Sequence, residues 1–162
     1  MKMRFATAVL LTIAISASAQ LSERFNKASY VTMQESPAVV VAKGKPVSAT
    51  IRFRVNKGFH VNSNKPSSDL LIPTEIKFEP QAGILIGKIA YPAGEEFELS
   101  FSPKQKLSVY QGNVAVTVPL SAAKRTKPGI YALRGSLSYQ ACNDNACFPP
   151  KTAPFELNIQ VK

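Results

Sequence analysis

Apolar and polar residues alternate along much of this chain, which is the pattern of a β-strand with one buried face. In residues 47–55 every second side chain is apolar, and the positions between them hold Ser, Thr and Arg. The same period of two returns in residues 114–120 and 153–161. Successive side chains of a strand point to opposite faces, so each segment predicts a strand that is buried on one side.

Shorter segments rich in β-branched and aromatic residues lie between these strands, bounded by Pro, Gly and Asn. Residues 62–69 are polar and predict an exposed loop. Beyond the N-terminus no segment has apolar residues at the helical spacing. Eight or nine strands at intervals of roughly 8 to 12 residues predict an all-β fold, namely a single-domain, immunoglobulin-like antiparallel β-sandwich, with a small closed barrel as the alternative. The shorter predicted strands cover residues 30–33, 38–42, 76–78, 84–91, 97–101, 107–109 and 130–141.

The N-terminus has the features of a secretory signal. Lys2 and Arg4 precede an apolar run over residues 6–17, and Ala17-Ser18-Ala19 has the A-x-A form of a cleavage site. The run is shorter than the roughly 20 residues of a membrane-spanning helix, so an uncleaved anchor is the weaker alternative. We therefore predict a cleaved signal peptide over residues 1–19, a flexible lead-in over 20–28 and an exported domain over 29–162, with no transmembrane segment in the mature chain.

Charge and composition exclude several functions. The net charge of +10 falls to +8 without the two cationic residues of the leader, but the Lys and Arg residues are scattered and no nucleic-acid motif accompanies them. We therefore predict no nucleic-acid partner. The single histidine, His60, and two cysteines fall short of a four-ligand zinc site, so neither a metal nor a cofactor is predicted. For His60 itself, a structural role at a strand end is favoured over a proton shuttle.

Both cysteines of the chain, Cys142 and Cys147, lie in the segment 138–150 with four residues between them. Export favours a disulfide between them, and the turn Asn-Asp-Asn-Ala predicts that they flank a hairpin. Pro149 and Pro150 cannot donate to a β-ladder and so place this hairpin at a sheet edge. A loop of six residues gains only about 2 kcal/mol from closure, and short surface disulfides are the labile ones. A reactive dithiol and a passive staple both remain open on this evidence.

The segment from Tyr139 to Pro150, with its pattern YQ-x-C…C-x-P-P, resembles the signature of the N-terminal periplasmic domains of DsbD, a bacterial thiol:disulfide interchange protein. The similarity continues through 91–92, 109–112 and 114–120, and more weakly through 58–61. This family has an immunoglobulin-like fold and passes electrons by thiol–disulfide exchange.

The resemblance implies a periplasmic thiol–disulfide exchange domain, a redox relay and so an oxidoreductase in the broad sense. Cys147 would form mixed disulfides with partners, and Cys142 would resolve them. Tyr139 and Phe148 are candidates for lining the site, and Phe101 is the candidate for the family's aromatic cap. The partners implied are a separate thioredoxin-like or membrane-embedded electron donor and oxidised periplasmic acceptor proteins. The alternative is a non-catalytic immunoglobulin-like binding or assembly module with a structural disulfide.

Overall fold

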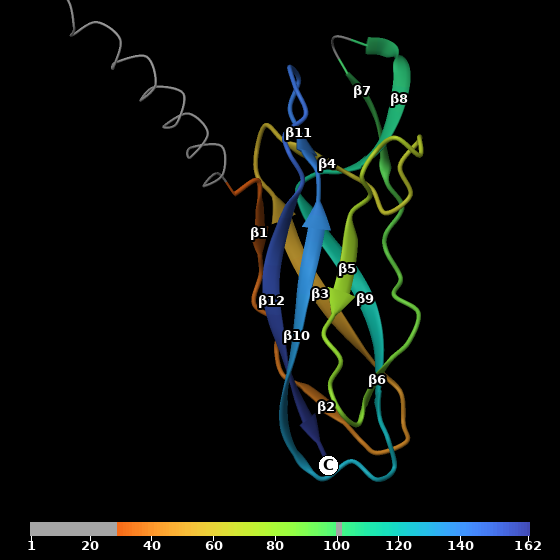
Figure 1. Ribbon diagram of the computed structural model, residues 1–162, viewed down its shortest axis with the longest axis vertical. Helices are drawn as coiled ribbons and strands as arrows, with labels where there is room; N and C mark the ends of the chain where they lie inside the picture. Colours follow the sequence, from red (N-terminus) through yellow and green to blue (C-terminus); the bar gives the residue numbers. More distant parts are fainter. Residues whose placement is uncertain (1–28, 100–101) are drawn as a thin grey trace, which may run out of the picture.

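The computed structural model describes residues 29–99 and 102–162, which form twelve β-strands in three four-stranded sheets (Figure 1). The predicted signal peptide, the lead-in and Phe101 lie outside these residues. Within the described ranges, no helix is long and apolar enough to cross a bilayer.

Two of the sheets lie face to face and make a β-sandwich (Figure 1). All strand pairs in them are antiparallel except β2 with β12, which is parallel. The first sheet has the order β1 (Val31–Met33), β3 (Val47–Val55), β9 (Asn113–Ala122) and β6 (Ile84–Ile86). The second has the order β2 (Val39–Val41), β12 (Lys151–Val161), β10 (Gly129–Tyr139) and β5 (Glu75–Phe78).

The inward faces of both sheets share one hydrophobic core, as the alternation of the sequence predicts. The first sheet contributes Ile51 and Phe53, and the second contributes Leu137 and Leu157, all almost fully buried. In β3 the Arg residues between the apolar positions are exposed. The period of two therefore places one face of each strand in the core and the other in water.

The third sheet lies at one end of the sandwich (Figure 1, top). A small apolar cluster of its own packs Phe97 and Leu71 against buried Leu107 and Val109. Residue Gln140 separates β10 from β11, so one chain segment passes from the sandwich into this end sheet. The end sheet has the order β11 (Ala141–Cys142), β4 (His60–Asn62), β8 (Ser102–Tyr110) and β7 (Glu95–Leu99).

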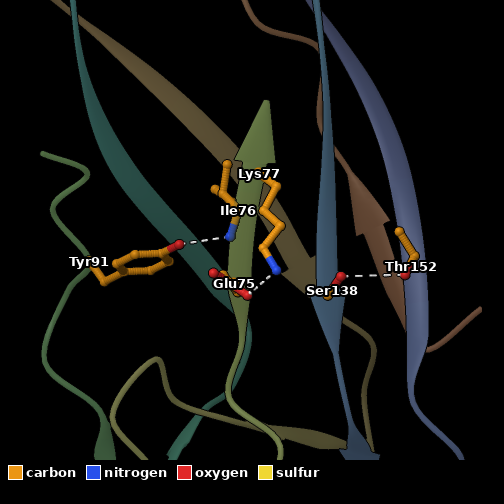
Figure 2. Close-up of polar contacts among 6 residues, drawn as sticks. All are labelled: Glu75, Ile76, Lys77, Tyr91, Ser138 and Thr152. Atoms are coloured by element: carbon orange, nitrogen blue, oxygen red, sulfur yellow. Dashed lines mark hydrogen bonds and ion pairs between the residues drawn. The ribbon is translucent and has the colours of Figure 1, made fainter. Parts of the chain in front are cut away.

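The edge strand β5 is held from two sides. β10 pairs with one side of it, and on the other side the backbone N–H of Ile76 donates to the Tyr91 hydroxyl at 2.7 Å (Figure 2). Figure 2 also shows Lys77 paired with Glu75 on the strand itself, at 2.9 Å. Tyr91 thus ties the segment that leads to β7 and the end sheet to the sandwich.

The all-β, immunoglobulin-like sandwich predicted from the sequence is confirmed, and the closed barrel is wrong because the sheets are open. The exposed loop predicted at residues 62–69 is wrong at its start, where Asn62 and Ser63 are buried. Asn62 Nδ2 donates to the carbonyl of Ile72 at 2.9 Å, and the Ser63 hydroxyl pairs with that of Ser108 at 2.8 Å. Buried polar side chains are stable where such partners exist.

Candidate functional site

The two cysteines form a disulfide at the free edge of the end sheet. The S–S distance is 2.04 Å and the Cα atoms are 3.9 Å apart, in an isolated antiparallel bridge. Between them, the Asn143 N–H donates to the carbonyl of Ala146, and Asn143 Oδ1 accepts the N–H groups of Asn145 and Ala146, all at 2.9 Å. The Asn-Asp-Asn-Ala turn predicted from the sequence is therefore built around the Asn143 side chain.

The two sulfur-bearing residues differ in exposure. Cys142 is 0% exposed, whereas Cys147 lies on the surface. A thiolate attacks a disulfide at one sulfur and expels the other, and access decides which sulfur is attacked. Cys147 is therefore the residue of the pair that an incoming thiolate can reach.

Hydrogen bonds fix the hairpin to the body of the protein. The Phe148 N–H donates to the carbonyl of Ala141 at 2.8 Å, and Gln140 Nε2 donates to the carbonyl of Phe148 at 3.2 Å. Buried Asn62 in turn donates to Gln140 Oε1 at 3.4 Å. The segment after Cys147 is thus hydrogen-bonded to residues 140–141, which directly precede Cys142.

Three aromatic rings pack together where the hairpin joins β12. Phe148 stacks on Tyr30 with ring centroids 4.7 Å apart, and Phe59 lies 4.8 Å from Tyr30 and 5.9 Å from Phe148. Lys151 Nζ lies 5.0 Å from the Tyr30 ring centroid. Aromatic pairs of this geometry stabilise beyond the area they bury, so the chain after Cys147 is anchored apart from the disulfide itself.

His60 lies directly across the β4–β11 ladder from Cys142. It is 2% exposed, and its ring packs on Phe97 of β7 with centroids 4.2 Å apart. Burial lowers the pKa of His60 below its usual 6.5 and outweighs the negative charge of Asp144, which acts in the opposite direction. At neutral pH the imidazole is therefore uncharged.

The predicted site-lining residues are distributed unevenly around the disulfide. Phe148 belongs to the aromatic group beside the hairpin, but Tyr139 is buried in the main core, where burial raises the pKa of its hydroxyl. Phe101 lies outside the described residues. Phe97 of β7 contacts the ring of His60, which is the ladder partner of Cys142.

Sequence reasoning missed Phe97 and, for His60, favoured a structural role over a proton shuttle. Residues 97, 99 and 101 alternate in one predicted strand, so the sequence pattern gives no reason to choose one of them as the residue near the site. Only the pairing of the strands in the structure distinguishes them. For His60 no nucleophile was visible nearby, because Cys142 follows 82 positions later in the chain. Among the described residues, no group of three or more His, Cys, Asp and Glu side chains is arranged to hold a metal ion.

Comparison with known proteins gives a family match over most of the chain. The family described as "Thiol:disulfide interchange protein DsbD, N-terminal" matches residues 28–159. No curated protein sequence matches.

Several solved structures are similar. The N-terminal domain of Neisseria meningitidis DsbD in its reduced form is 23% identical over 70% of this chain and 78% of that chain, with a TM-score of 0.47. In the complex between the DsbD and PilB N-terminal domains of the same organism, the similar chain is 24% identical over 67% of this chain and 73% of that chain, with a TM-score of 0.44. The N-terminal periplasmic domain of ScsB from Proteus mirabilis is 14% identical over 80% of this chain and 44% of that chain, with a TM-score of 0.49.

Proposed function

The chain belongs to the family of N-terminal domains of the thiol:disulfide interchange protein DsbD, and on that premise we propose that it relays electrons between proteins through the Cys142–Cys147 pair. Thiol–disulfide exchange is the chemistry of this family. The observation that supports this role in the chain itself is the disulfide at a sheet edge, with one sulfur-bearing residue exposed and the other buried.

The relay has two half-reactions. In the loading step, a donor thiolate attacks the Cys147 sulfur, expels Cys142 as thiolate and forms a mixed disulfide, which a second donor thiol resolves. In the delivery step, the Cys147 thiolate attacks the disulfide of an oxidised acceptor and expels one acceptor sulfur. The Cys142 thiolate then attacks Cys147, re-forms the intramolecular disulfide and releases the reduced acceptor. Two electrons pass in each cycle.

We infer that the chain works in the periplasm with partners of two kinds, a separate thioredoxin-like or membrane-embedded donor and oxidised periplasmic acceptor proteins. A thioredoxin-like donor would need an unobstructed approach to Cys147, and the exposed turn of small and polar residues offers one. The Neisseria DsbD N-terminal domain has been solved in complex with the N-terminal domain of PilB, which supports another protein as a direct partner.

The test is trapping of mixed disulfides. In a Cys142→Ala variant, Cys147 attacks an acceptor but nothing resolves the product, so partner-linked adducts accumulate and are identified by mass spectrometry after alkylation. A Cys147→Ala variant is the matched control, because its remaining thiol is buried and traps far less. Absence of adducts from both variants in a periplasmic extract contradicts the relay.

The alternative of a non-catalytic binding module with a structural disulfide is not favoured by the family match. The two functions differ in reduction potential. A structural disulfide has a potential below about −300 mV, whereas a relay lies above it. Equilibration of the disulfide with glutathione or thioredoxin couples measures this value directly.

A further inference from the structure

His60 is placed beside the sulfur that must become a nucleophile in the delivery step. In the antiparallel β4–β11 pair, His60 and Cys142 are direct partners. The Cβ atoms of such partners are about 4.5–5.5 Å apart and lie on the same face of the sheet. Both residues are almost completely buried, at 2% and 0% exposure, so they share one enclosed space.

One ring nitrogen of His60 is unused by the fold. Nε2 is buried and has no hydrogen-bond partner among the described residues. An unsatisfied buried nitrogen destabilises the fold, and a structural histidine avoids this cost by taking a partner. The ring is nevertheless held by its packing on Phe97, at 4.2 Å between centroids.

The charged groups around His60 leave the ring neutral. Asp144, in the turn between the cysteines, is the acid whose charge reaches the imidazole, and burial outweighs its effect on the pKa. On β7, Glu95 lies on the same face as Phe97, whereas Glu96 and Glu98 lie on the opposite face, where Lys106 pairs with Glu96 at 2.9 Å. On β8, the Tyr110 hydroxyl is engaged by Asn64 and by the carbonyl of Pro92.

We propose that His60 accepts the proton of the Cys142 thiol when Cys142 resolves the mixed disulfide, an inference that rests on the proposed relay function. A buried thiol resists ionisation, because burial disfavours the thiolate, and only the thiolate attacks a disulfide. A neutral imidazole with a free nitrogen in the same enclosed space removes this obstacle.

The step balances as follows. The proton moves from Cys142 Sγ to the imidazole and leaves a thiolate and an imidazolium. The Cys142 thiolate then attacks Cys147 Sγ, the intramolecular S–S bond forms, and the acceptor sulfur departs with the electron pair of the mixed disulfide. The imidazolium returns its proton to solvent or to the departing sulfur. In the loading step the transfer is reversed: the imidazolium gives a proton to the Cys142 thiolate that the donor expels.

The aromatic disulfide dithionitrobenzoate separates the two events in the reduced protein. Attack by Cys147 releases one coloured thionitrobenzoate anion, and resolution by Cys142 releases the second. In His60→Phe, which keeps a ring against Phe97, we expect the first phase at the wild-type rate. The second phase is expected to slow at least about tenfold at neutral pH, since a positioned base contributes ~10² or more. At alkaline pH, where hydroxide in solution can replace a positioned base, the two proteins converge.

His60→Gln and Phe97→Leu are the controls. Gln has hydrogen-bonding groups but cannot accept a proton at neutral pH, so it behaves as Phe does, whereas Phe97→Leu loosens the packing and keeps the base. A second phase at the wild-type rate in both His60 variants, or an equal slowing of both phases, overturns the role of His60. Failure of the wild-type protein to release the second anion at any pH, or failure of the Cys142→Ala variant to trap partners through Cys147, contradicts the relay function instead.

Discussion

At the scale of single residues, the environment of the imidazole is open to direct measurement, because His60 is the only histidine of the chain. Its ring protons therefore give one unambiguous set of signals in a proton NMR titration. We expect a pKa below 6.5, since burial disfavours the imidazolium. Asp144→Asn should lower the pKa further, because the charge that favours the imidazolium is removed. Asp69→Asn, at an exposed acid in another loop, is the control, and a wild-type value at or above 6.5 contradicts the described burial.

The same residue makes the stability of the domain depend on pH. The pKa of His60 is lower in the folded chain than in the unfolded one, so the unfolded state binds more protons at pH values between the two. The free energy of unfolding should therefore fall as the pH drops below about 6.5, the unfolded value. Urea titrations at neutral and mildly acidic pH measure this loss. In His60→Phe the loss should be smaller, and an equal loss in both proteins would assign it to carboxyl groups instead.

Sequence reasoning reached the reactive residues but not their setting. Cys142 and Cys147 were recognisable because they are close in sequence and carry distinctive chemistry. His60 and Phe97 reach the site through strand pairing, from segments far away along the chain. Hydrophobic periodicity predicts which face of a strand is buried, but it contains no information on which strands become neighbours.

At the scale of elements, buried Gly135 in β10 lies at a closely packed point of the second sheet. Its partners across the ladders are Phe78 and Phe155, whose rings meet edge to face with centroids 5.5 Å apart. A Cβ at position 135 would lie 2.5 Å from Cζ of Phe155 and 3.0 Å from the carbonyl oxygen of Lys77.

Gly135→Ala should therefore destabilise the domain by about 1–3 kcal/mol, the usual cost of overpacking, although alanine has the higher strand propensity. Urea denaturation measures the change. Ser136→Ala, one position further on the same strand, is the matched control and should cost less. A Gly135→Ala variant as stable as the wild type would show that the Phe155 ring can move aside freely.

The strands of the sandwich were predictable to different degrees. Residues 47–55 and 114–120 alternate strictly and form β3 and most of β9 as expected. The predicted strand at 107–109 is the last part of the longer β8, which begins at Ser102. Proline is tolerated near the start of a strand, so its presence at position 103 ended the prediction too early. The parallel pairing of β2 with β12 was also unexpected, because alternation does not reveal strand direction.

At the scale of the whole molecule, the disulfide contributes little to the stability of the sandwich. The main core is built from both large sheets, and the cysteine loop closes only six residues at one end. A Cys142→Ala, Cys147→Ala double variant should remain folded and lose about 2 kcal/mol or less in the free energy of unfolding. Circular dichroism and urea denaturation test this, with the reduced wild-type protein as control. Loss of the folded state in the double variant would make the disulfide a structural requirement.

The ladder between β10 and β12 runs through eleven residue pairs, from Gly129–Val161 to Tyr139–Lys151, and the cysteine hairpin connects these strands beyond its last pair. The C-terminus lies at the opposite end of the sandwich from that hairpin (Figure 1). Lys162 is therefore a suitable attachment site. A protein tethered to an electrode or fused to a fluorescent reporter through Lys162 would present Cys147 on the side away from the attachment point. For the same reason, a redox sensor made from this domain could carry its reporter at Lys162 without covering the cysteine pair.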